Sequence, residues 1–212
     1  MFLHLLNEND GKGFLAAARL ISLVDSPLLW EGKTEAGLTG KDDLSETSFQ
    51  KNEAEEKVIQ GFEQEVKVLE DDVRVAMDSG STAGNGSTPP RRAFGFFQSS
   101  QLQPVEKVFL EHLKSLPLGK MNASDERIKI GKSLLNAWVK EDKEALPSVA
   151  KIMLFELISL ALADGVISDA ELQLLKEFGQ LHGLDSLDFD DLLVSVKSIS
   201  QAAQKAISII FE

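Results

Sequence analysis

Carboxylates gather around one short turn in the C-terminal half of this chain. A very apolar segment ends in Asp164 and Gly165, and Ser168, Asp169 and Glu171 follow. Gly165 tolerates a positive φ, so the backbone can reverse where the first helix ends. Ser168 and Glu171 have the spacing of a capping box, in which the two side chains bind free amides at the start of the next helix. Carboxylates this close together either hold a cation or only cap a helix, and the sequence leaves both possibilities open.

The turn matches the loop of an EF-hand only in its second half. Gly165 and Glu171 fall on the glycine and the final glutamate of that motif, but its first and third ligands would be Leu160 and Leu162. Leucine has no oxygen to donate, whereas calcium takes about six to eight oxygen ligands. We therefore do not expect an ordinary EF-hand.

A similar pattern occurs in the N-terminal half, where an insertion divides it. Residues 14–25 form an apolar segment that ends in Asp25, and residues 52–62 match residues 168–178 position by position. Apolar residues agree along this match, and so do the polar pairs Asn52 with Ser168, Glu53 with Asp169, and Glu55 with Glu171. Internal similarity of this kind is typical of repeated structural units. We therefore predict two related helix-turn-helix repeats, each with an acidic turn.

The pattern of an apolar helix, Ala-Asp-Gly, an apolar residue and Ser-x-x-Glu resembles the TerB-like tellurite-resistance domain. The same fold also occurs in DjlA-type co-chaperones. The resemblance covers roughly residues 1–25, 52–72 and 105–195, and it is sharpest from Ala163 to Glu171. It implies a compact helical domain whose acidic turns are proposed to chelate metal. One departure is that Asp25 is followed by serine and proline instead of glycine.

This resemblance implies a non-enzymatic stress-response module that binds a divalent cation of unknown identity, a protein partner or a membrane-associated complex. The ligands would be Asp164, Asp169 and Glu171, with Asp25, Glu53 and Glu55 as a weaker second set. The alternative is a metal-free, scaffold-like or co-chaperone-like interaction module in which these acids only cap helices. In that case the partner would bind the inserted loop and the linker.

Length and composition predict a soluble globular protein of one domain, or of one domain with a mobile segment. The chain has 212 residues, 43% of them hydrophobic, and no cysteine, which excludes disulfides and thiolate metal sites. Its longest apolar run is too short to span a bilayer, and its N-terminus lacks the features of a signal peptide, so we expect a cytoplasmic protein. The net charge of −12 and the absence of a basic face argue against binding to nucleic acid.

The sequence contains little that predicts an enzyme. The three histidines, His4, His112 and His182, lie far apart, and no motif for a nucleophile or a phosphate loop occurs. His112 lies on an apolar stripe and is predicted to be a core residue. The candidate acids lie at helix caps, where the helix dipole favours their ionised form. We therefore expect no raised pKa among them and no general acid.

The hydrophobic pattern predicts an all-α bundle with no β-strand. Residues 1–75 form the first repeat, with an inserted loop at 26–51, and residues 104–212 form the second repeat and the C-terminal helices. Residues 13–25 and 149–163 are the most apolar helices, so we expect them to be adjacent in the core. A last helix is predicted from about residue 188 to 210, with a break near Ser198.

The sequence also contains two irregular segments, the linker at 76–103 and the insertion at 26–51. Residues 76–103 are rich in Gly, Ser and Pro and are predicted to be a flexible linker. Phe94, Phe96 and Phe97 would either pin this linker to the body or form a docking motif for a partner or a membrane surface. Within the insertion, the apolar residues that should anchor it to the domain are Leu28, Leu29 and Trp30.

Overall fold

The protein is mostly helical, as predicted. The computed structural model describes residues 2–38, 46–79, 105–139 and 146–211. The α-helices of these residues are α1 (Glu8–Leu23), α2 (Glu53–Ser79), α3 (Val105–Lys114), α4 (Leu118–Met121), α5 (Ser124–Val139), α6 (Pro147–Ala161), α7 (Asp169–Leu181) and α8 (Ser186–Phe211). Two short 3-10 helices, η1 (Leu3–Leu5) and η2 (Glu35–Gly37), complete the helical part. The predicted linker, with its three phenylalanines, falls largely outside the described residues, and α2 extends past its expected end.

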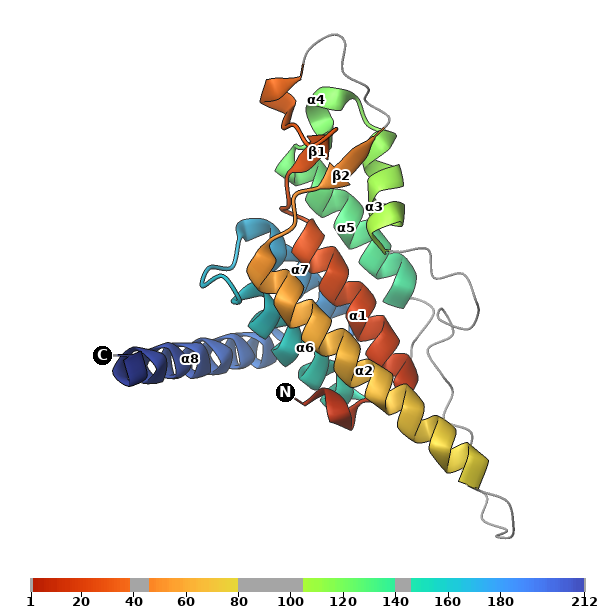
Figure 1. Cartoon of the computed structure of the whole chain (residues 1–212), viewed down its shortest axis with the longest axis vertical. Coiled ribbons are helices and arrows are strands. Elements are labelled where there is room, and N and C mark those ends of the chain that lie inside the picture. Colours follow the sequence, from red (N-terminus) through yellow and green to blue (C-terminus); the bar gives the residue numbers. More distant parts are fainter. Residues whose placement is uncertain (1, 39–45, 80–104, 140–145, 212) are drawn as a thin grey trace.

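Helix α1 lies at the centre of the molecule and packs against α2, α3, α5, α6 and α7 (Figure 1). Its first three turns contain Gly11, Gly13 and three alanines at 16–18, which lets neighbouring elements come close. At Gly11 a β-carbon would lie 3.2 Å from both methyl groups of Val66 on α2. The two sequence halves therefore share one core and are not separate folding units.

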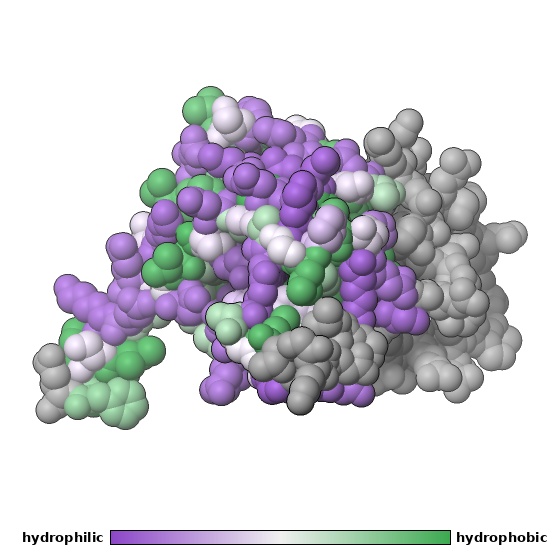
Figure 2. Space-filling view, turned by 90° about the horizontal axis from the view of Figure 1, so that it is seen from above, coloured by the Kyte–Doolittle hydropathy of each residue, from purple (hydrophilic) through white to green (hydrophobic). Residues whose placement is uncertain are grey.

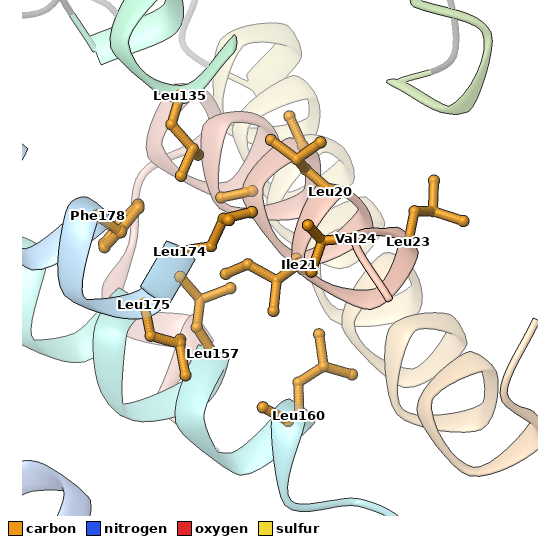
Figure 3. Packing of buried hydrophobic residues seen from close by; sticks show 14 of the residues in the cluster. Leu20, Ile21, Leu23, Val24, Leu135, Leu157, Leu160, Leu174, Leu175 and Phe178 are labelled. Atoms are coloured by element: carbon orange, nitrogen blue, oxygen red, sulfur yellow. The ribbon is translucent and has the colours of Figure 1, made fainter. Parts of the chain in front are cut away.

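The predicted contact between the two most apolar helices is confirmed. Leu20 and Ile21 of α1 and Leu157 and Leu160 of α6 have no solvent exposure, and the two helices are in contact. Leu174, Leu175 and Phe178 of α7 complete this part of the core (Figure 3). Nearly every face of α6 is covered, as its almost uniform apolarity predicts.

The prediction that the chain has no strand was wrong. The insertion contains β1 (Leu28–Trp30) and β2 (Thr47–Phe49), which pair antiparallel with Leu28 opposite Phe49. Each strand has only three residues, too few for an alternating pattern to stand out in the sequence. Leu28 and Trp30 are fully buried and Leu29 is half-buried, so the predicted anchors do attach the insertion to the domain.

Two further expectations need correction. Helix α8 is continuous through Ser198, because neither glycine nor proline interrupts its backbone there. His112 is exposed rather than buried, and its Nδ1 lies 2.8 Å from the carbonyl oxygen of Val108, one turn earlier in α3. Among the described residues, no helix has both the length and the apolar character needed to cross a membrane.

Trp30→Ala should lower the free energy of unfolding by about 3–5 kcal/mol, because it empties a fully buried site in the shared core. Urea unfolding followed by far-UV circular dichroism measures this loss. Val68→Ala is the control, since its side chain is 57% exposed and the change should stay within about 0.5 kcal/mol. A cost for Trp30→Ala as small as that of the control would show that the insertion is not part of the core.

Candidate functional site

The turn between α6 and α7 has the local structure that its sequence predicts. Gly165 adopts a φ of 95°, which only glycine reaches without strain. Ser168 caps α7: its Oγ accepts a hydrogen bond from the Glu171 amide at 3.2 Å, and its own amide donates to Glu171 Oε2 at 2.8 Å. The capping box is therefore complete, and it fixes the Glu171 carboxyl at the start of α7.

The turn after α1 has no left-handed residue and is closed by a buried arginine instead. One Nη of Arg127, on α5, donates hydrogen bonds to the carbonyl oxygens of Leu23 at 2.6 Å and Ser26 at 2.5 Å. Ser26 Oγ also donates to the carbonyl of Ser22 at 2.7 Å. These bonds satisfy the free carbonyls at the end of α1, so this turn does not need the glycine that the other turn has.

Arg127 is held in an aromatic site formed by the insertion and α3. Its guanidinium lies 5.5 Å from the ring centre of Phe49 and 5.8 Å from that of Phe109. The residue is only 3% exposed, and burial lowers its pKa to about 10, against the opposing effect of the Asp25 charge. The insertion thus contributes to positioning the first acidic turn.

A hydrogen bond joins the two acidic turns, although they are far apart in the sequence. Asn52 lies directly before α2, and its Nδ2 donates to Oδ2 of Asp164 at 2.9 Å. Its Oδ1 accepts from the Ala54 amide at 3.0 Å, in the manner of a helix cap. The start of α2 is therefore next to the turn between α6 and α7.

Two glutamates at this junction are buried. Glu55 and Glu171 are 3% and 2% exposed. Glu55 Oε2 and Glu171 Oε1 have no hydrogen-bond partner among the described residues, although both atoms are shielded from solvent. An unpaired buried oxygen of this kind is costly, and in native structures it commonly marks a missing proton, water or ion.

Burial also raises the pKa of both carboxyls, contrary to the prediction from their capping positions. The pKa of Glu55 rises to about 7, mainly through burial and further through the charges of Asp25 and Asp164, against a hydrogen bond from Ser22. The pKa of Glu171 rises to about 8, again mainly through burial, with added repulsion from Asp25 and Glu55. Desolvation here outweighs the helix dipole and the capping box.

The structure brings together four of the six predicted site residues. Asp25, Glu55, Asp164 and Glu171 interact electrostatically at the junction of the two turns. Glu53 and Asp169 are exposed, and neither contributes to the raised pKa values. Sequence reasoning missed the roles of Asn52, Ser22 and Arg127. The alignment of Asn52 with Ser168 was a usable signal for the first, whereas nothing local marks the other two.

The acidic side chains of this junction provide oxygen donors around a buried site of negative potential. In the part of the chain that the structure describes, no three carboxylate or histidine groups lie close enough to share a metal ion. The donors are of the type that hard cations prefer, but a cation would require the carboxylates to move closer together.

Comparison of the chain with protein-family models, with curated proteins and with solved structures finds no match.

Replacing Glu55 and Glu171 together by Gln should stabilise the protein at alkaline pH and have little effect in acid. Because the folded pKa values of about 7 and 8 exceed the ordinary 4.5, the folded state binds more protons than the unfolded state. Stability that is fully present below about pH 4.5 is therefore lost as the pH rises toward 7 for Glu55 and toward 8 for Glu171, by about 1.4 kcal/mol per unit for each carboxyl, and the loss levels off above those values. Glutamine has no such dependence.

Urea unfolding at several pH values, with a chelator present, measures this difference. The matched control is Glu53→Gln, which removes an exposed charge from the same helical turn and should leave the pH profile of the wild type unchanged. Parallel pH profiles for the wild type and the double variant would contradict the raised pKa values.

Proposed function

We propose that this protein is a non-enzymatic, TerB-like helical module that binds a divalent cation where its two acidic turns meet. One observation carries the proposal: two turns far apart in sequence bring four carboxyl groups within electrostatic range of one another, and two of their oxygens are buried with no partner among the described residues. A role in stress response and a location in the cytoplasm are further predictions, which come from the resemblance and from composition.

The energetics of the junction favour a bound cation. Each buried carboxyl is destabilised in its ionised form by desolvation and by the other acids nearby. A proton relieves this cost for one carboxyl at a time, whereas a divalent cation relieves it for several together. The partnerless oxygens, Glu55 Oε2 and Glu171 Oε1, are the atoms best placed to become ligands.

The donor set argues for a hard cation such as magnesium, calcium or manganese. The described acidic side chains of the junction offer carboxylate oxygens, and the chain has no cysteine. Asp25 and Asp164 are exposed and would bind at the open side, with water completing the coordination. Because Glu55 and Glu171 must lose their protons to act as ligands, affinity should increase from acid to alkaline pH.

A metal-free interaction module is the second candidate, favoured by the complete capping box. Glu171 already binds the Ser168 amide through one oxygen, which is the arrangement expected of a cap. In this case protons would neutralise the buried carboxyls, and a protein partner would bind elsewhere on the surface.

Divalent cations should raise the melting temperature of the wild-type protein by an amount that grows with the logarithm of their concentration. Each tenfold increase above the dissociation constant adds about 1.4 kcal/mol, or about 3–5 °C for a chain of this size. Calorimetry with magnesium, calcium, manganese and zinc in turn measures this shift.

Variants distinguish the cation-binding module from the metal-free interaction module. Glu171→Gln and Asp164→Asn should abolish the shift, and glutamine preserves the capping box, so the first variant should still fold. Asp190→Asn changes an exposed acid on α8, outside the junction, and should melt with the same shift as the wild type. If none of the four cations moves the wild-type melting temperature, the metal-free module is the better description.

A further inference from the structure

Helix α8 has one half packed on the body and one half that projects into solvent. Phe189 and Val196 are buried, and this half packs against α6. The projecting half is residues 197–211, in which every side chain is exposed except the half-buried Ser200. Figure 1 shows the helix extending well beyond the body, and Figure 2 shows hydrophobic side chains near the end of the projecting arm.

A single apolar stripe runs along the whole helix, through both halves. Its residues are spaced alternately by three and four positions, as in a coiled-coil seam: Phe189, Leu192, Val196, Ile199, Ala203, Ala206 and Ile210. The buried half uses this stripe to pack on the body. The projecting half carries the same seam without a partner: Ile199 is 58% exposed and Ile210 is 73% exposed.

The projecting half also differs from the rest of the chain in charge. No acidic residue occurs between Asp191 and Glu212, and this segment contains two lysines, Lys197 and Lys205. The whole chain has a net charge of −12. A second copy of the chain would therefore meet least repulsion at this helix.

We propose that the projecting half of α8 pairs antiparallel with α8 of a second copy, which makes the protein a dimer. In this arrangement Ile199 faces Ile210 of the other copy, and Ala203 faces Ala206, so the stripe is complementary to itself about a two-fold axis. The alanines at the centre allow close approach of the two helices. The isoleucines fill the wider space toward each end, where crossing helices diverge.

The charge of the body and the length of the projecting helix favour a second copy of the chain over a membrane surface as the partner of the stripe. Residues 197–211 span about 22 Å of helix, so antiparallel pairing holds the two acidic bodies farther apart than the screening length of about 8 Å at physiological salt. On an anionic membrane a helix lying flat would hold the acidic body close to like charge. The central alanines would also add little insertion energy, whereas they suit a close helix pair.

Cross-linking tests the pairing and its direction in the full-length protein, which has no native cysteine. Mixing Ile199→Cys protein with Ile210→Cys protein should give a disulfide-linked dimer under mild oxidation. Ile199→Cys protein alone should not, because its two sulfurs would be separated by eleven residues of helix, about 16 Å, beyond the reach of a disulfide. Efficient linking of Ile199→Cys with itself would overturn the antiparallel arrangement.

Sedimentation equilibrium tests the dimer itself. The wild type should reach twice the 23.2 kDa mass of one chain as its concentration rises. Ile199→Lys and Ile210→Lys should each weaken the dimer at least about tenfold. The matched control is Leu187→Lys, on the same helix and 71% exposed but off the stripe, which should dimerise as the wild type does.

Three results would overturn the proposal. The first is a wild type that stays monomeric at every concentration. The second is a dimer that both stripe variants leave intact. The third is a monomer that floats with phosphatidylglycerol vesicles through α8, which would assign the stripe to a membrane surface instead.

Discussion

The fold depends on the ability of α1 to contact five helices at once. A helix surrounded in this way must be apolar around most of its circumference, and it must be thin enough for its neighbours to approach. The glycines at 11 and 13 and the alanines at 16–18 meet the second requirement, since a β-carbon at Gly11 would lie only 3.2 Å from Val66. Large residues such as Leu20 and Ile21 then fill the other half of the core. Helices α2, α3, α5, α6 and α7 all pack directly on this one.

The acidic junction follows from the same packing. Because α2 and α6 both lie against α1, the start of α2 comes next to the turn after α6, and Glu55 and Glu171 are buried together. Ionised carboxyls so close to each other and away from water need a counter-charge or a proton. The nearest buried cation, Arg127, binds backbone carbonyls at the end of α1 and so serves the fold rather than the glutamates. Among the described residues, no buried cation is therefore used as a counter-charge for Glu55 and Glu171.

The features that could be predicted from the sequence are those determined by residues close together in the chain. The capping box of Ser168 and Glu171, the left-handed Gly165 and the apolar helices α1 and α6 could all be identified, because each is determined within a few turns. The two short strands and the aromatic site of Arg127 could not, since they depend on contacts between residues far apart in the chain. The raised pKa values of Glu55 and Glu171 could not be predicted for the same reason. A capping position suggests an ionised acid, and only the packed structure reveals that the cap is buried.

The order of the elements along the chain has a consequence for synthesis. Helix α1 is complete at Leu23, but α6, which covers much of its apolar surface, begins only at Pro147. A growing chain can cover α1 with α2 and α3 first, but the part of its apolar surface that α6 covers stays open until residues 147–161 have been made. Long-range contacts of this kind form late in folding, and apolar surface that stays exposed in the meantime is prone to aggregate.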